Sequence, residues 1–142
     1  MKTELSKKSK YYIPKERRLE LAHFCMQYPD WVNKRVHSLF KVGYSYADQS
    51  GVHQAEAKDA TFEAASNVIY LSFCMDVVEK TARETDPVIG DYIFQAAIRG
   101  VSYDKLSAYT QIPCCRNEFY ELYRKFFWLL DQRLRYDLTQ EA

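Results

Sequence analysis

Apolar residues recur at three- and four-residue steps over most of the chain, which is the spacing of amphipathic helices. The first such pattern starts after Pro14, a residue suited to a first helical position, and stops at Pro29. Asp30 is a candidate cap for a second, short helix that turns Trp31 toward the core. The pattern therefore predicts two helices within the first third of the chain.

Residues 41–59, "KVGYSYADQSGVHQAEAKD", show no helical period and contain two of the four glycines. They predict a long loop, either a disordered insertion or a binding loop. From about residue 59 to residue 84 the helical pattern returns, and "VIYLSFCMDVV" (68–78) is apolar nearly all the way round. Because a surface helix needs only one apolar stripe, this helix is expected to be central in a bundle or shared with another subunit, as in a homodimer.

The last third predicts three helices joined by short turns. Asp86 and Gly100 are the expected cap and stop of the first, and Ser102 is the expected cap of a short second helix, "YDKLSAYT". After the turn "QIP", residues 114–136 predict a long final helix. The expected fold is all-α: a helical bundle with a C-terminal helix-turn-helix, residues 86–136, and a long final helix. We expect a flexible basic arm over residues 1–10 and a single helical domain over 11–142.

The final helix has an apolar side that includes Phe119 and Phe126, and a polar side whose residues suit DNA. Arginine pairs with guanine or phosphate and asparagine with adenine, while tyrosine, arginine and lysine also bind the DNA backbone. Against this reading, Glu118 and Glu121 are typical of a face that points to water or to a basic protein. With the basic residues of neighbouring segments, the DNA-binding candidates are Arg116, Asn117, Tyr120, Arg124, Lys125, Lys105, Arg17 and Arg18.

Charge is unevenly distributed, although the net charge is only +1. Residues 1–45 hold ten Lys and Arg against four Asp and Glu, residues 46–99 hold four against nine, and residues 100–142 hold six against six. A basic first third beside an acidic middle suggests two different partner surfaces, although solvated helix faces also produce such splits.

The sequence lacks the patterns that are typical of several classes of protein. No apolar run is long enough for a membrane span, and no signal peptide pattern follows the basic N-terminus. No nucleophile, phosphate-loop or metal-protease motif is present, and the three histidines lie too far apart for a metal motif. The four cysteines lack CxxC spacing and are expected to be reduced thiols. We therefore expect a cytoplasmic protein with no enzymatic activity, no cofactor, no metal and no membrane partner.

The residues also carry a family resemblance. "YIFQAAIRGVSYDKLSAYTQI" resembles the helix-turn-helix of sigma-factor region 4, and "FYELYRKFFWLL" is similar to the recognition helix of ArpU-like and RinA-like phage late-transcription regulators. The segment "YIPKERRLELAHFCMQYPDW" is similar to small proteins of Firmicute phages and prophages. By position, the resemblance implies backbone contacts for Tyr120, Arg124 and Lys125. One departure is "PCCRNE", about two residues longer than the family's usual turn, which rotates the start of the reading helix by more than half a turn.

These observations favour a phage or prophage transcriptional regulator, in the cytoplasm of a bacterial host cell, that binds DNA and also touches RNA polymerase, as sigma-like modules do. The alternative is a phage-encoded inhibitor or adaptor that binds a host nuclease, a defence complex or RNA polymerase. The near-zero net charge and the glutamates of the final helix favour that alternative. A structural phage component is a third interpretation.

Overall fold

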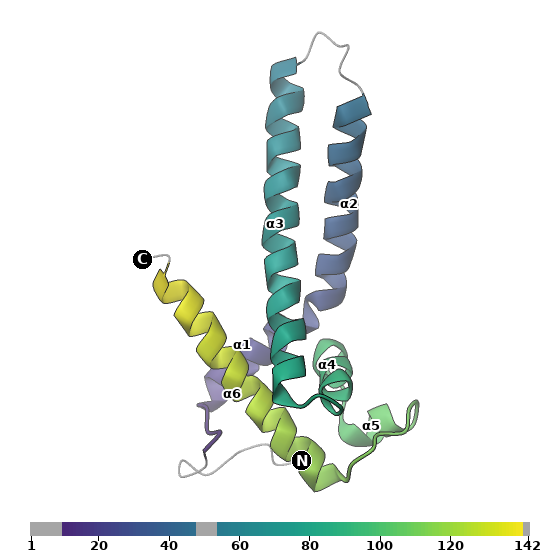
Figure 1. The fold of residues 1–142 in the computed structure, drawn as a ribbon, viewed down its shortest axis with the longest axis vertical. Coiled ribbons are helices and arrows are strands. Elements are labelled where there is room, and N and C mark those ends of the chain that lie inside the picture. Colours follow the sequence, from purple (N-terminus) through teal and green to yellow (C-terminus); the bar gives the residue numbers. More distant parts are fainter. Residues whose placement is uncertain (1–9, 48–53, 141–142) are drawn as a thin grey trace. The chain divides into compact units, whose positions relative to one another are not determined.

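The protein is all-α. The computed structural model describes residues 10–47 and 54–140, with side chains for 10–43 and 60–135, and these residues form helices and no strand (Figure 1). The final helix is 25 residues long, so the predicted all-α fold with a long last helix is confirmed. The helices are α1 (Lys15–Met26), α2 (Tyr28–Ala47), α3 (Gln54–Thr85), α4 (Gly90–Arg99), α5 (Tyr103–Ser107) and α6 (Arg116–Gln140).

The chain groups into two compact units, where the sequence predicts one helical domain over residues 11–142. We call residues 1–27 and 77–142 the core unit, and residues 28–76 the hairpin unit. The boundary between them falls within α3, after Asp76. The predicted flexible arm lies almost wholly outside the described residues, because these begin at Lys10.

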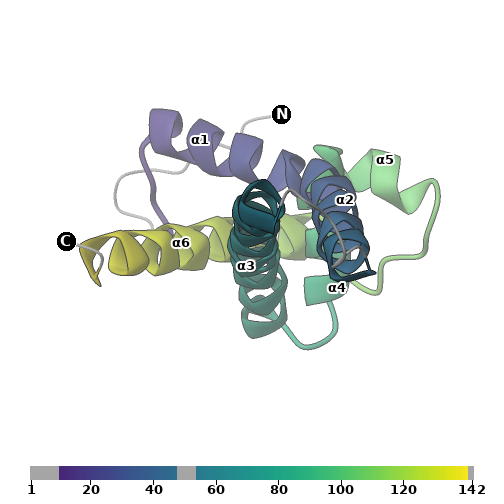
Figure 2. The same cartoon turned by 90° about the horizontal axis from the view of Figure 1, so that it is seen from above.

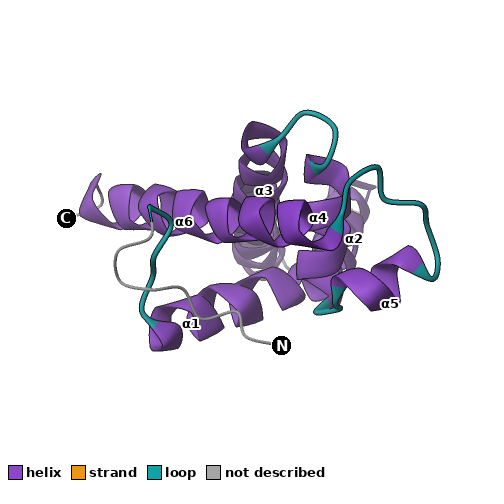
Figure 3. Ribbon diagram, turned by 90° about the horizontal axis from the view of Figure 1, so that it is seen from below, coloured by secondary structure: helices purple, strands orange, loops and turns teal. Residues whose placement is uncertain are grey.

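Four helices build the core unit together with the last turns of α3. Helices α1, α4 and α6 pack on one another, and the short α5 packs on α4 and α6 (Figures 2 and 3). The predicted apolar side of α6 is confirmed at three positions, since Phe119, Phe126 and Leu130 are fully buried. Other fully buried side chains of this unit are Leu21, Cys25, Val78, Thr81, Ile93 and Leu106.

Asp86 organises the turn between α3 and α4. Its carboxylate accepts hydrogen bonds from the backbone N–H groups of Val88 (2.8 Å) and Ile89 (2.7 Å), and these bonds lower the pKa of Asp86. Asp86 is therefore a capping residue as predicted, but α4 itself begins at Gly90 and not at Pro87. A Cβ at Gly90 would collide with the carbonyl of Ala82, so the absence of a side chain lets α4 start directly against α3.

In the hairpin unit, α2 and the first part of α3 run antiparallel, side by side (Figures 1 and 2). The predicted loop over 41–59 is wrong at both ends, because α2 continues to Ala47 and α3 begins at Gln54. Residues 54–59 are "QAEAKD", mostly strong helix formers, and one internal glycine costs a helix only about 1 kcal/mol. Local helix propensity therefore outweighs the missing apolar period. The connecting residues 48–53 lie outside the described part.

The start of α2 also differs from the prediction. The helix begins at Tyr28, so Asp30 lies in its first turn and does not cap it. Asp30 instead forms an ion pair with Lys34 one turn later (2.9 Å), a favourable arrangement for a carboxylate near a helix N-terminus. The second helix is 20 residues long and therefore not short. Trp31 is buried, as predicted.

Candidate nucleic-acid interface

The corner between α4 and α5 is formed as the sequence predicts. Gly100 adopts the left-handed conformation (φ 64°), and its N–H donates to the carbonyl of Ala96, which ends α4. Two residues later the Ser102 hydroxyl accepts a hydrogen bond from the N–H of Lys105 (3.2 Å) and caps α5. The predicted stop and cap are confirmed, although α5 ends at Ser107 and is shorter than the predicted "YDKLSAYT".

Tyr103 fixes the position of α6 relative to α5. Its hydroxyl donates to the carbonyl of Cys114 (2.7 Å), and its backbone N–H donates to the hydroxyl of Tyr120 (2.9 Å). Its ring also contacts the ring of Phe119, with 5.3 Å between centroids. One residue of α5 thus holds both the turn that precedes α6 and the first turns of α6 itself.

The first turn of α6 lies on the surface. The carbonyl of Cys115 accepts the N–H of Phe119 (3.0 Å), which makes Cys115 the residue that precedes the helix. Arg116, Asn117 and Glu118 are all exposed, and so is Cys115. Because α6 begins at Arg116, residues 113–115 of the longer "PCCRNE" segment belong to the turn and leave Arg116 and Asn117 on the helix.

Arg116 forms an ion pair with Asp104 of α5, and both side chains are exposed. Exposed pairs contribute at most about 1 kcal/mol, so a phosphate or a base can replace Asp104 as the partner of Arg116 at little cost. Lys105 is exposed next to Asp104. We call Asp104, Lys105, Cys115, Arg116 and Asn117 the α6 tip. The sequence did not identify Asp104 as a site residue. It precedes Arg116 by twelve residues, and the path of the turn between them cannot be predicted from the sequence.

Two further predicted residues come together at a cavity between α1 and α6. Arg18 of α1 and Arg124 of α6 are half-buried and line one cavity of about 230 Å³, together with Tyr120. Arg124 follows Asn117 by seven residues and therefore lies on the same side of α6. The exposed Glu121 lies between them on that side. The remaining lining residues are Tyr11, Ile13, Leu19, Ala22, Tyr123 and Phe127.

Arg17 and Lys125 have partners within the core unit. Arg17 binds Asp131 of α6 (2.6 Å) and Glu20 (3.1 Å). Although partial burial disfavours the charged guanidinium, these hydrogen bonds raise the pKa of Arg17 above its ordinary value. Lys125 donates to the carbonyl of Thr85 (3.1 Å) and so satisfies the C-terminal end of α3. Their contacts give both residues a structural role, and their binding to DNA stays a prediction.

The Asp131 carboxylate is nearly buried, with a side chain 9 % exposed, and it also accepts from Arg135. Asp131→Ala leaves the partly buried guanidinium of Arg17 without its main acceptor. We expect the free energy of unfolding to fall by about 2 to 3 kcal/mol, measured by urea denaturation with circular dichroism. Glu20 is the other partner of Arg17, and the Glu20 side chain is 66 % exposed. Glu20→Ala is therefore expected to change the free energy of unfolding by less than about 1 kcal/mol. Equal effects of the two substitutions would refute this ranking.

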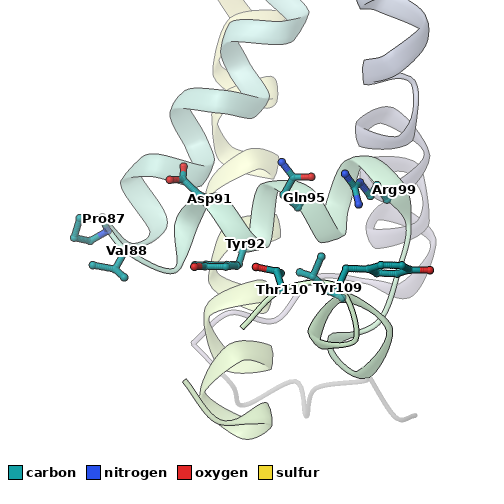
Figure 4. Close-up of a pocket in the computed structure, with 9 residues that line it drawn as sticks. Pro87, Val88, Asp91, Tyr92, Gln95, Arg99, Tyr109 and Thr110 are labelled. Atoms are coloured by element: carbon teal, nitrogen blue, oxygen red, sulfur yellow. The ribbon is translucent and has the colours of Figure 1, made fainter. Parts of the chain in front are cut away.

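A groove of about 700 Å³ lies on another part of the core unit, between α4 and the segment that follows α5 (Figure 4). Val88 and Tyr109, which are 60 % and 75 % exposed, belong to its lining, and Asp91 and Arg99 add one charge of each sign. Tyr109 follows Leu106 by three residues, but of the two only Leu106 is buried. The other lining residues are Pro87, Tyr92, Gln95, Leu106 and Thr110. This mixed surface suits a protein segment better than a polyanion.

The cysteines are free thiols in different surroundings. Cys25 and Cys74 are buried, Cys114 is half-buried and Cys115 is exposed. Burial raises the pKa of Cys25 to about 12, so this thiol is inert at neutral pH. Within residues 10–47 and 54–140, no group of acidic, histidine and cysteine side chains is arranged to hold a metal ion. No helix in the same residues has the length and apolar character needed to cross a membrane.

Comparison with known proteins finds no family model, no curated protein and no solved structure that matches the chain. The likeness to ArpU-like and RinA-like regulators therefore remains a resemblance of short segments. A functional proposal has to be argued from the geometry of the α6 tip and its surroundings.

Proposed function

We propose that the core unit binds double-stranded DNA as a transcriptional regulator of a phage or prophage, with the α6 tip in the major groove. One observation carries the proposal: Arg116 and Asn117 are exposed on the first turn of a helix that α5 holds in place. In helix-turn-helix proteins the N-terminal residues of the second helix contact base edges. The order of α4, α5 and α6 supports the same docking mode.

The side chains of the α6 tip suit distinct parts of the duplex. Asn117 matches the N6 and N7 edge of adenine, and Arg116 matches guanine or a phosphate. Lys105 is placed on the neighbouring helix for a second phosphate. Arg124 and Arg18 extend the cationic surface along one side of α6.

The distribution of charge between the two units also favours the core unit as the DNA-binding part. The core unit holds sixteen Lys and Arg against thirteen Asp and Glu, whereas the hairpin unit holds four against six. The net charge of +1 thus conceals a basic unit and an acidic one. Phosphate binding depends on the local potential at the docking surface, so a low overall charge does not exclude it.

The test is a fluorescence anisotropy titration of a labelled promoter duplex with the full chain at two salt concentrations. With about four phosphate contacts, affinity should fall roughly 100-fold between about 50 mM and about 200 mM salt. Asn117→Ala should weaken binding to the preferred duplex and reduce its advantage over a scrambled duplex. If no duplex is bound at the lower salt concentration, the core unit is not a DNA-binding module.

The groove of Figure 4 favours a second candidate, an adaptor or inhibitor that binds a host protein such as RNA polymerase or a nuclease. Val88 and Tyr109 offer it an exposed apolar contact surface, while Glu118 and Glu121 on α6 would repel phosphates. Its test is a pull-down from a nuclease-treated host extract. A partner that is retained without nucleic acid and lost with Tyr109→Asp supports the adaptor, and only nucleic-acid-dependent partners would exclude it.

A further inference from the structure

The hairpin unit leaves much of its apolar surface open. Among the described side chains of residues 28–76, seven large apolar ones are exposed, with exposed fractions from 46 % to 75 %. Single exposed apolar residues are ordinary, but a cluster on one small unit marks a contact surface. The seven are Val36, Leu39 and Phe40 of α2, and Phe62, Ile69, Tyr70 and Phe73 of α3.

These side chains form a second apolar stripe on each helix. On α2, residues 36, 39 and 40 are three and four positions apart, which places them on one side of the helix. On α3, residues 62, 69 and 73 are seven and four positions apart and likewise share a side. The buried residues follow separate stripes at the same spacing: Trp31 and Ser38 on α2, and Ala64, Leu71, Cys74 and Met75 on α3. Each helix thus has one buried stripe and one open stripe.

We propose that the open stripes pair two copies of this chain, with α2 of one hairpin unit beside α3 of the other in a four-helix interface. The proposal does not depend on DNA binding. A unit of two helices within 49 residues is too small to enclose an apolar core by itself. A second hairpin of the same kind completes the bundle, because both partners then bury equivalent stripes in a symmetric contact.

The open area is sufficient for a stable dimer. Large apolar side chains have surfaces of roughly 200 Å² each, so seven of them at the observed exposures leave roughly 800 Å² open on each copy. Specific interfaces bury about 800 Å² per partner. A second copy therefore covers an area of the size that lasting association requires.

The net charges of the two helices favour a contact between α2 of one copy and α3 of the other. The described side chains of α2 comprise three Lys and Arg against one acidic residue, whereas those of α3 up to residue 76 comprise two acidic residues and no Lys or Arg. The charged residues of α3 are Glu63 and Asp76, both exposed. Placing α2 against α3 of the other copy sets a basic helix beside an acidic one, whereas pairing α2 with α2 would set two basic helices side by side.

Sedimentation velocity of the purified full chain, without DNA, tests the proposal between about 1 µM and about 100 µM protein. We expect a dimer for the wild type. Ile69→Glu and Phe40→Glu should each weaken the dimer at least about 100-fold, because each buries a charge in the interface. Asn67→Glu is the matched control: it adds the same charge to an exposed position two residues from Ile69, on a different face of α3, and should leave the dimer intact.

The same two variants test the pairing of α2 with α3. If both helices contribute to the interface, Phe40→Glu on α2 and Ile69→Glu on α3 should weaken the dimer by similar factors while the helical circular dichroism is retained. A wild-type monomer throughout the concentration range overturns the proposal, as does a dimer insensitive to Ile69→Glu. Failure to bind DNA in the anisotropy titration leaves this result unaffected.

Discussion

Phe119→Ala is expected to lower the free energy of unfolding of the core unit by about 3 to 5 kcal/mol. Phe119 is fully buried, and its ring lies 5.6 Å from that of Tyr120 and 5.8 Å from that of Tyr123, in addition to its contact with Tyr103. The truncation leaves a cavity at the point where α5 and α6 meet. Because natural domains are stable by only about 5 to 15 kcal/mol, much of the stability of this unit depends on one ring.

Urea denaturation followed by circular dichroism measures this effect. Tyr109→Ala is the control, since Tyr109 belongs to the same helix-turn-helix segment and is 75 % exposed; it should change the free energy of unfolding by less than about 0.5 kcal/mol. A loss of less than about 1 kcal/mol for Phe119→Ala would mean that α6 is not anchored through this ring.

Arg116→Glu is expected to weaken DNA binding by about 30- to 100-fold while the protein stays folded. The substitution removes a cation from the first turn of α6 and places a carboxylate beside Asp104, where the duplex is proposed to dock. Stability should change little, because Arg116 and Asp104 are both exposed and their pair contributes little to folding. Anisotropy titrations at low salt measure the loss of affinity.

Two further variants separate the role of Arg116 from that of charge in general. Lys80→Glu reverses one exposed charge of the core unit, on α3, and should reduce affinity far less than Arg116→Glu. Asp104→Asn frees Arg116 from its pair and removes a negative charge, so it should strengthen binding several-fold. Equal effects of Lys80→Glu and Arg116→Glu would contradict docking through the α6 tip.

Local signals predicted the corner between α4 and α5 correctly, although the bounds of α4, α5 and α6 differ from the predicted ones. Gly100 and Ser102 end one helix and start the next because each acts on its own neighbours in the chain, through a left-handed conformation and a side-chain cap. The buried side of α6 followed from the spacing of its apolar residues for the same reason. Between residues 41 and 59 the missing apolar period wrongly predicted a loop at both ends, because the residues there favour a helix without an apolar stripe.

Long-range pairing could not be predicted from the sequence. Arg17 and Asp131 are 114 residues apart, and Lys125 reaches the carbonyl of Thr85 across 40 residues. Both basic residues look identical in sequence to a surface cation such as Arg116. Only the fold distinguishes a cation that holds two helices together from one that is exposed at the start of α6.

The apolar character of residues 68–78 allowed two interpretations, a central helix or a helix shared between subunits. One side of the helix is covered within the chain, because Leu71 and Met75 are buried whereas Ile69 and Phe73 are exposed. Sharing of the exposed side with another subunit stays a prediction. A helix that is apolar on all sides thus has one side that is already covered and another that is available for a partner. The spacing of residues cannot assign these sides, because both stripes follow the same helical period.

Alkylation of Cys115 tests the proposed docking of α6 most directly, because this exposed thiol immediately precedes Arg116. In a Cys114→Ser chain, iodoacetamide labelling followed by peptide mass spectrometry reports the rate at Cys115, and the absence of label at the buried, inert Cys25 shows that the protein stays folded. We predict that a bound duplex slows labelling of Cys115 at least about 10-fold at low salt, and that the protection disappears at high salt. Unchanged labelling of Cys115 in the presence of bound duplex would contradict the placement of the α6 tip on DNA.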